Sequence, residues 1–162
     1  MYSDPLGLSS GKSDFDLKKY REAELKHGRV AMLGALGFLV GEVFNPFFDG
    51  QITGPAIYQF QQADELFPFF WEWVVFTIAL IEGQNILVGW ESPRDVKRSS
   101  GMAGLREDYV NGDLGFDPLN LRPAEGEAFD LMRTKELQNG RLAMLGVAGM
   151  VAQELVTGQK IF

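Results

Sequence analysis

The sequence has no cysteine, a single histidine and too few basic residues to form a positive face. Without cysteine the chain cannot form disulfides, thiolate nucleophiles or zinc–thiolate sites. One histidine, His27, leaves little scope for catalysis that depends on this side chain, and no nucleophile–base pair or glycine-rich phosphate loop is visible. The net charge of −7 argues against a nucleic-acid partner. These absences predict a protein that is not an enzyme and binds no nucleic acid.

The chain also lacks an uninterrupted apolar run of about 20 residues, the length that a lone transmembrane helix requires. Its apolar residues gather instead in three stretches, which predict helices over roughly residues 17–44, 68–90 and 124–156 in a single domain, residues 1–162. The uncharged part of the first stretch is 12 residues long, between Arg29 and Glu42. Hydropathy therefore leaves two alternatives open, a soluble three-helix bundle and a membrane protein.

The positions of the basic residues favour the membrane protein. If the chain crosses the membrane three times, fourteen of the fifteen Lys and Arg residues lie on one side of the membrane, and only Lys160 lies on the other. This matches the charge bias that orients membrane proteins, and a soluble bundle has no reason to show it. We therefore expect an all-α membrane protein with three transmembrane helices. Glu42 and Glu154, near the side poor in basic residues, are expected to be solvated helix ends.

The first and third stretches begin with the same motif. Residues 24–34 read ELKHGRVAMLG and residues 136–146 read ELQNGRLAMLG, 112 positions later. With three spans the first and third helices run in the same direction, so a pseudo-two-fold axis can relate them where they cross. Small residues recur along both helices and predict close backbone packing in lipid; they are Ala31, Gly34, Gly37 and Gly41, and Ala143, Gly146, Gly149 and Ala152.

Within each motif the glutamate and the arginine are five residues apart, about 140° around a helix axis, and are poorly placed to pair with each other. In two crossing helices, however, Glu24 can reach Arg141 while Glu136 reaches Arg29. An unpaired charge at mid-membrane costs roughly 2.5–3.5 kcal/mol. We therefore expect two reciprocal ion pairs that hold the first helix to the third, and a purely structural clamp is one reading of them.

Further polar residues lie in apolar surroundings without an evident charged partner. His27 and Asn139 each follow their glutamate by three positions, on the same helix face. Gln153 returns to nearly the face of Asn139, and Glu82 lies within the middle stretch. A plainer alternative is that these two residues bind no ligand. Gln153 would then form a hydrogen bond between helices, and Glu82 would be solvated. Isolated oxygen and nitrogen donors suit several cofactors, each with one magnesium ion that needs a single axial ligand.

The two motifs closely resemble helices one and three of the light-harvesting chlorophyll-binding protein superfamily. The resemblance covers nearly the whole chain and includes the Asp-Pro-Leu turns at residues 4–6 and 117–119. Residues 44–58 and 89–93 are most similar to the fucoxanthin chlorophyll a/c-binding, red-lineage branch. The implied cofactors are chlorophyll a, chlorophyll c and carotenoids such as fucoxanthin or diadinoxanthin.

The resemblance also implies a role for each candidate site residue. Six side chains would bind chlorophyll magnesium: Glu24, His27, Glu82, Glu136, Asn139 and Gln153. Two arginines would form the cross-helix ion pairs that support these ligands: Arg29 and Arg141. Two turns would hold carotenoid end rings: Asp4, Pro5 and Leu6, and Asp117, Pro118 and Leu119.

The function implied by the resemblance is a light-harvesting antenna that passes excitation energy to a photosystem, and the loop over residues 45–67 favours photosystem I. Its partners would be the photosystem core, neighbouring antenna subunits and thylakoid lipids. The expected location is the thylakoid membrane of a plastid, with the N-terminus stromal and the C-terminus lumenal. Two alternatives stay open: a stress-related quencher of the same fold, and a small transporter that uses buried carboxylates as a proton relay.

Overall fold

The computed structural model describes residue 7 and residues 9–44, 47–92, 104–124 and 126–161. Within these residues the chain forms α1 (Asp14–Val43), the short 3₁₀ helix η1 (Phe47–Gly50), α2 (Ala56–Leu66), α3 (Phe70–Gly89) and α4 (Glu127–Thr157). One isolated antiparallel bridge joins Trp90 to Leu105. The predicted ranges 17–44, 68–90 and 124–156 correspond to α1, α3 and α4, whereas α2 and η1 were not predicted.

The two motif helices have ordinary local signals at their ends. Ser13 caps α1, because its hydroxyl oxygen accepts a hydrogen bond from the amide of Asp16 at 3.2 Å. Acidic residues follow in the first turn of both helices and suit the positive end of the helix dipole. Gly158, with φ of 63°, ends α4 in the left-handed conformation that glycine adopts without strain.

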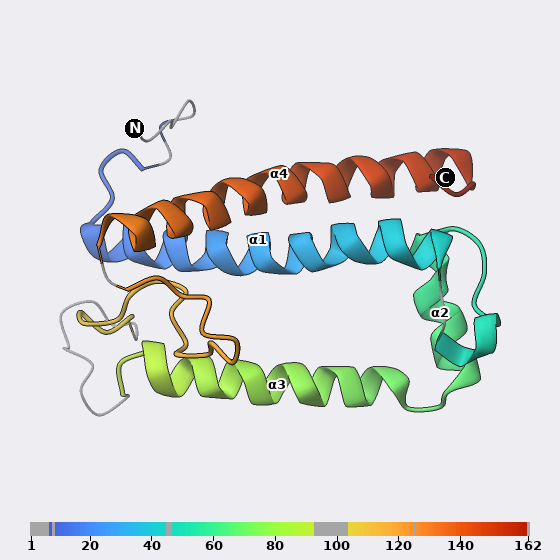
Figure 1. Ribbon diagram of the computed structural model, residues 1–162, viewed down its shortest axis with the longest axis horizontal. Helices are drawn as coiled ribbons and strands as arrows, with labels where there is room; N and C mark the ends of the chain where they lie inside the picture. Colours follow the sequence, from blue (N-terminus) through green and yellow to red (C-terminus); the bar gives the residue numbers. More distant parts are fainter. Residues whose placement is uncertain (1–6, 8, 45–46, 93–103, 125, 162) are drawn as a thin grey trace.

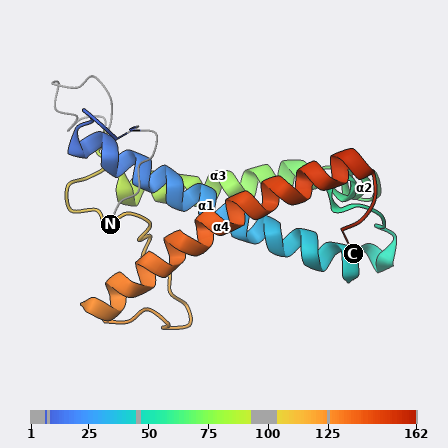
Figure 2. The same ribbon diagram turned by 90° about the horizontal axis from the view of Figure 1, so that it is seen from above.

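The helices α1 and α4 run side by side in the same direction and cross each other like an X (Figures 1 and 2). We call the end where both helices begin the motif end, and the opposite end, where α2 lies across them, the α2 end (Figure 1). The helix α3 runs back from the α2 end to the motif end. There the segment over residues 104–124 fills the space between α3 and α1 (Figure 1).

The crossing point of α1 and α4 is set by the glycine of each motif. A Cβ atom added to Gly28 would lie 3.0 Å from the Gly140 Cα, and one added to Gly140 would lie 2.9 Å from the Gly28 Cα. The expected close contact along the stripe of small residues is confirmed only at Gly34, where an added Cβ would lie 3.7 Å from Val147 Cγ2 of α4. Gly37 and Gly149 have open space around them, and Gly41 faces the Gln59 side chain of α2. The helices diverge on either side of the motif glycines, so only this pair needs to lack a side chain.

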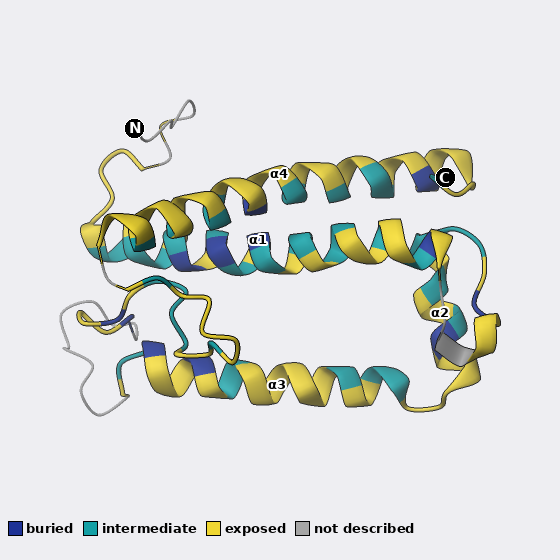
Figure 3. Ribbon diagram, in the orientation of Figure 1, coloured by how far each residue is buried: buried dark blue, intermediate teal, exposed yellow. Residues whose placement is uncertain are grey.

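The molecule has little apolar core of its own. Its accessible surface is 12243 Å², whereas a compact soluble protein of 18.1 kDa exposes about 8,100 Å². Within the described residues the buried apolar side chains are Leu25, Ile52, Ala63, Leu105 and Tyr109. Large apolar residues of α1, α3 and α4 are exposed instead (Figure 3). Such a surface needs to be covered by something other than this chain.

Of the described helices, α3 alone is long and apolar enough to cross a membrane, with a mean hydropathy of 1.2. Its 20 residues span about 30 Å, which matches the hydrocarbon core of a bilayer. The helices α1 and α4, of 30 and 31 residues, are longer but carry the motif charges. The all-α fold is therefore observed, and the three-span arrangement stays a prediction.

Candidate functional site

Both reciprocal ion pairs that the repeat predicts are present where α1 and α4 cross. The Arg29 Nε atom lies 2.7 Å from Glu136 Oε1, and the Arg141 Nε atom lies 2.6 Å from Glu24 Oε1. The four side chains are between 27% and 47% exposed, so they are only partly desolvated by the protein itself. Each helix thus supplies the cation for the carboxylate of the other.

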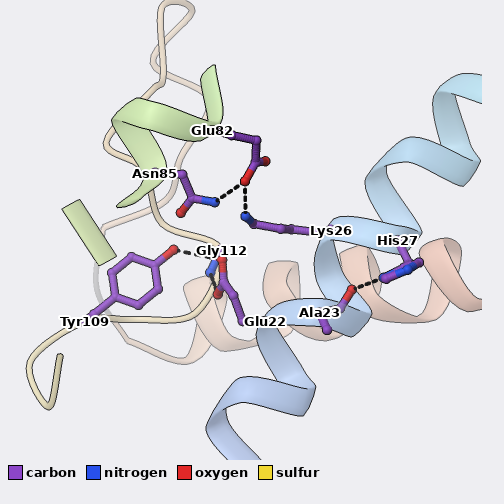
Figure 4. Close-up of polar contacts among 8 residues, drawn as sticks. All are labelled: Glu22, Ala23, Lys26, His27, Glu82, Asn85, Tyr109 and Gly112. Atoms are coloured by element: carbon purple, nitrogen blue, oxygen red, sulfur yellow. Dashed lines mark hydrogen bonds and ion pairs between the residues drawn. The ribbon is translucent and has the colours of Figure 1, made fainter. Parts of the chain in front are cut away.

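One ring nitrogen of His27, Nε2, has no hydrogen-bond partner among the described residues. Its Nδ1 atom lies 2.7 Å from the carbonyl oxygen of Ala23, one turn earlier in α1 (Figure 4). A carbonyl oxygen only accepts, so Nδ1 carries the proton in this hydrogen bond. The neutral imidazole then keeps its lone pair on Nε2, as a metal-binding histidine requires. The side chain is exposed on the outside of the helix.

Asn139 and Gln153 are both exposed on α4. Neither side chain makes a hydrogen bond within the part of the chain that the structure describes. The structure does not bring these two residues, or His27, together with the other candidate ligands. No group of three or more His, Cys, Asp or Glu side chains among the described residues is arranged to hold a metal ion. Their role as separate ligands of chlorophyll magnesium stays a prediction.

Glu82 of α3 has a charged partner that the sequence analysis missed. The Lys26 Nζ atom lies 2.6 Å from Glu82 Oε2, and the Asn85 amide donates to the same oxygen at 3.4 Å (Figure 4). Lys26 lies inside the motif of α1, where the second copy has Gln138. The lysine in the first motif, in place of glutamine in the second, was the sequence signal for this ion pair. At the level of the motifs α3 lies beside α1 and not beside α4.

The turn at Asp117 is organised by its own backbone. The Asp117 carboxylate accepts the amide hydrogens of Arg122 at 2.8 Å and Leu121 at 3.0 Å. These two hydrogen bonds lower the pKa of Asp117 below its ordinary value of 3.8. Pro118 and Leu119 are exposed on the turn. The other predicted turn, with Asp4, Pro5 and Leu6, lies outside the described residues.

A cavity of about 400 Å³ lies beside this turn. Its lining combines apolar side chains with the motif charges and includes Phe116, Leu121, Phe129, Met132, Arg29 and Glu136. A second cavity of about 670 Å³ lies between the first turns of α1 and α4, and Glu136 lines this one as well. Glu136 therefore lines both cavities, whereas its partner Arg29 lines only the smaller one.

Glu22 holds the segment over residues 104–124 against α1, a role that sequence reasoning missed. Its side chain is buried and accepts two hydrogen bonds, from the Tyr109 hydroxyl at 3.1 Å and the Gly112 amide at 2.9 Å (Figure 4). Arg29 Nη2 donates to the Gly112 carbonyl at 2.8 Å. Burial, followed by the adjacent Glu22 carboxylate, raises the pKa of Tyr109 to about 12. Arg29 thus joins α1, α4 and this segment.

The expectation that Glu42 and Glu154 are solvated helix ends was wrong. Their side chains are 7% and 0% exposed. Glu154 accepts from the amide of Ile57 at 2.8 Å and Glu42 from that of Ala56 at 3.4 Å, both in the first turn of α2. The free amides at a helix N-terminus attract carboxylates. These residues therefore fix α2 across the ends of α1 and α4, and they were misread because α2 was not predicted.

Comparison with known proteins gives a consistent result. Residues 2–155 match the family model described as "Chlorophyll A-B binding protein". The chain is 47% identical to light-harvesting complex stress-related protein 1 of Chlamydomonas reinhardtii, over 98% of this chain and 62% of that protein. It is 46% identical to a fucoxanthin-chlorophyll a-c binding protein of Isochrysis galbana, over 96% of this chain and 72% of that protein. It is 32% identical to a chlorophyll a-b binding protein of Petunia hybrida, over 96% of this chain and 58% of that protein. The chain thus spans less than two thirds of the length of its stress-related relative.

Proposed function

Because the chain belongs to the chlorophyll a-b binding protein family, we propose that it is a light-harvesting antenna protein. In this role it binds chlorophylls and carotenoids and transfers excitation energy to a photosystem, with photosystem I favoured. The family is one of pigment-binding proteins rather than enzymes. The bound pigments supply the light absorption, and the chain fixes their spacing and orientation. Chlorophyll a, chlorophyll c and a carotenoid such as fucoxanthin or diadinoxanthin are the proposed cofactors.

The observation that carries this proposal is the free Nε2 atom of His27 on an exposed apolar helix. A hydrogen bond already holds Nδ1, so the ring is oriented, and the remaining lone pair on Nε2 belongs to an exposed side chain. The residues after His27 on α1 include the exposed Val30, Leu33 and Leu36. A flat apolar macrocycle with a central magnesium ion would satisfy both the lone pair and this surface.

The glutamates suit the same ligand because each is neutralised by a cation from another helix. Glu24 pairs with Arg141, and Glu136 pairs with Arg29. A neutral pair can offer an oxygen to magnesium without leaving a net charge in the membrane. Glu82 would do so with the help of Lys26. Asn139 and Gln153 would offer uncharged amide oxygens, and the Asp117 turn would position a carotenoid end ring beside its cavity.

We place the protein in the thylakoid membrane of a plastid, with α1, α3 and α4 as three spans. The relatives named above from Chlamydomonas and Isochrysis are chloroplastic. Of the basic residues that the structure describes, all but Lys160 lie toward the motif end, so this end and the N-terminus would be stromal and the α2 end lumenal. Neighbouring antenna subunits, thylakoid lipids and the photosystem core would cover the exposed apolar faces.

The test is pigment analysis of the purified protein, by absorption spectrum and by extraction. We expect chlorophyll a with chlorophyll c and a carotenoid, and a His27→Leu variant that folds but has lost about one chlorophyll per chain. Gln138→Leu is the matched control, because this exposed residue is also in a motif but is not a proposed ligand. A colourless protein would refute the antenna function and favour the transporter. Chlorophyll b in place of chlorophyll c would refute the pigment assignment.

A second candidate function on the same fold is quenching, in which the protein dissipates excitation energy as heat. The similarity to stress-related proteins favours it. The identity of 47% extends over 98% of this chain. Fluorescence lifetimes of the pigment-loaded protein separate the two roles. A lifetime of several nanoseconds supports the antenna, whereas a much shorter one supports the quencher.

A further inference from the structure

The two motif glutamates differ in the oxygen that they leave free. In Glu24, Oε1 lies 2.6 Å from Arg141 Nε and Oε2 lies 3.2 Å from Arg21 Nη1. In Glu136, Oε1 lies 2.7 Å from Arg29 Nε, and Oε2 has no polar partner within the described residues. The pseudo-symmetry of the ion pairs therefore does not extend to the second carboxylate oxygen.

The difference does not arise from a missing arginine. Arg133 is the repeat equivalent of Arg21, and each precedes its glutamate by three residues. The Arg133 guanidinium is turned elsewhere, however. Its Nη1 atom lies 3.9 Å from Asp130 Oδ1, and its carbon lies 5.7 Å from the centre of the Phe129 ring. The Arg133 guanidinium thus lies beside Asp130 and Phe129, and within the described residues it forms no ion pair with Glu136.

The first copy has neither of these two groups. Lys18 occupies the position of Asp130, and Leu17 occupies the position of Phe129. A lysine repels a nearby guanidinium, and leucine offers it no aromatic face. Lys18 itself donates to backbone carbonyls of the segment over residues 104–124. Nothing at these two positions therefore competes with Glu24 for Arg21.

We propose that Glu136 is the tighter and Glu24 the weaker of the two repeat-related sites for a magnesium tetrapyrrole, and that Arg21 sets this difference. This inference rests on the proposed function. An axial bond to magnesium uses a lone pair of the carboxylate, and a guanidinium at hydrogen-bond distance withdraws electron density from that oxygen. The oxygen keeps a second lone pair, so Arg21 weakens the site without closing it. Glu136 also lines both cavities of the motif end.

The experiment compares Arg21→Gln and Asp130→Asn with the unmodified chain. Each full-length protein is reconstituted in detergent with a carotenoid extract and increasing amounts of chlorophyll a, and the chlorophyll bound per chain is measured after extraction. We expect Arg21→Gln to lower the half-saturating chlorophyll concentration of the weaker site by about two- to fivefold, as for measured surface ion pairs, which include pairs one turn apart on a helix. Asp130→Asn frees Arg133, which can then approach Glu136. We expect this variant to raise the half-saturating chlorophyll concentration of the tighter site by a similar factor.

Two further variants make the assignment specific. The gain from Arg21→Gln should vanish in the double variant Arg21→Gln/Glu24→Leu, because leucine offers no ligand atom and the weaker site is then absent. Lys135→Gln is the matched control, since Lys135 is exposed next to Glu136 and its removal changes the charge equally. Unchanged binding by Arg21→Gln, or a gain that survives in the double variant, would overturn the inference. An unmodified chain that binds no chlorophyll would instead overturn the proposed function, and the inference with it.

Discussion

Replacing Arg29 should destabilise the protein more than replacing Arg141, although the repeat makes the two residues equivalent. Arg29 binds both Glu136 and the carbonyl of Gly112. Its removal leaves Glu136 without a cation and releases the segment over residues 104–124 from α1. Arg141 binds only Glu24 among the described residues, and Glu24 keeps Arg21 when Arg141 is lost.

The magnitudes follow from the exposure of the side chains. Arg29 and Glu136 are 37% and 31% exposed. Their pair therefore lies between an exposed one, worth about 0.2–1 kcal/mol, and a buried one, whose disruption costs about 3–5 kcal/mol. Taking about 2 kcal/mol for the pair and about 1 kcal/mol for the hydrogen bond to Gly112, Arg29→Leu costs about 3 kcal/mol. Arg141→Leu should cost about 1 kcal/mol, because one cation stays beside Glu24.

The assay is thermal denaturation of the pigment-loaded protein, followed by loss of circular dichroism in the pigment absorption bands. A difference of about 2 kcal/mol corresponds to about 4–8 °C in Tm for a chain of this length. Lys135→Leu is the control, since it removes one positive charge from the same turn of α4 without breaking an ion pair. If Arg141→Leu lowered Tm as much as Arg29→Leu, the dual role of Arg29 would be refuted.

Three further predictions concern pH and packing. The folded pKa of Tyr109, about 12, lies above its ordinary value of 10. Its contribution to stability is therefore complete below pH 10 and lost as pH rises toward 12, and Tyr109→Phe should flatten the alkaline unfolding curve that the unmodified chain shows. The folded pKa of Asp117 is lowered rather than raised, so the pH dependence runs the other way. Its contribution to folding stability is lost as pH falls below about 4. Asp117→Asn should remove that acid dependence and reduce the carotenoid bound per chain, and retention of both would contradict the role of the turn. Gly28→Ala, whose new Cβ would lie 3.0 Å from the Gly140 Cα, should lower the yield of reconstituted complex, whereas Gly37→Ala, with open space around it, should not.

The sequence was sufficient for the features that depend on the repeat. The five-residue spacing of glutamate and arginine makes pairing within one helix unfavourable, and two parallel copies can satisfy it only by exchanging partners. Both exchanged pairs are present, and the family resemblance drawn from the same motifs is confirmed by the comparisons. The long helices were also predictable, since their apolar stretches and end signals agree.

Features that depend on how closely elements approach one another in space were not predictable. The crossing point is at Gly28 and Gly140 rather than along the longer stripe of small residues, because crossed helices approach closely at one level only. The buried state of Glu42 and Glu154 depends on the first turn of α2, and Lys26 finds Glu82 only because α3 runs back beside α1. For these three acidic residues the partner lies in an element whose position no local pattern specifies.

The cations at the proposed glutamate ligands also link pigment binding to the order of assembly. Glu24, Glu136 and Glu82 are each neutralised by a residue of a different helix. In isolated helices Glu136 and Glu82 would enter the membrane unpaired, which is unfavourable by roughly 2.5–3.5 kcal/mol for each, whereas Glu24 keeps Arg21 of its own helix. The paired carboxylates of Glu136 and Glu82 therefore exist only after the helices have met. Conversely, the helices leave large apolar faces uncovered, so they gain most of their stability when pigments fill those faces. Folding and pigment binding should then be a single cooperative step, and pigment loss should coincide with the separation of α1 from α4.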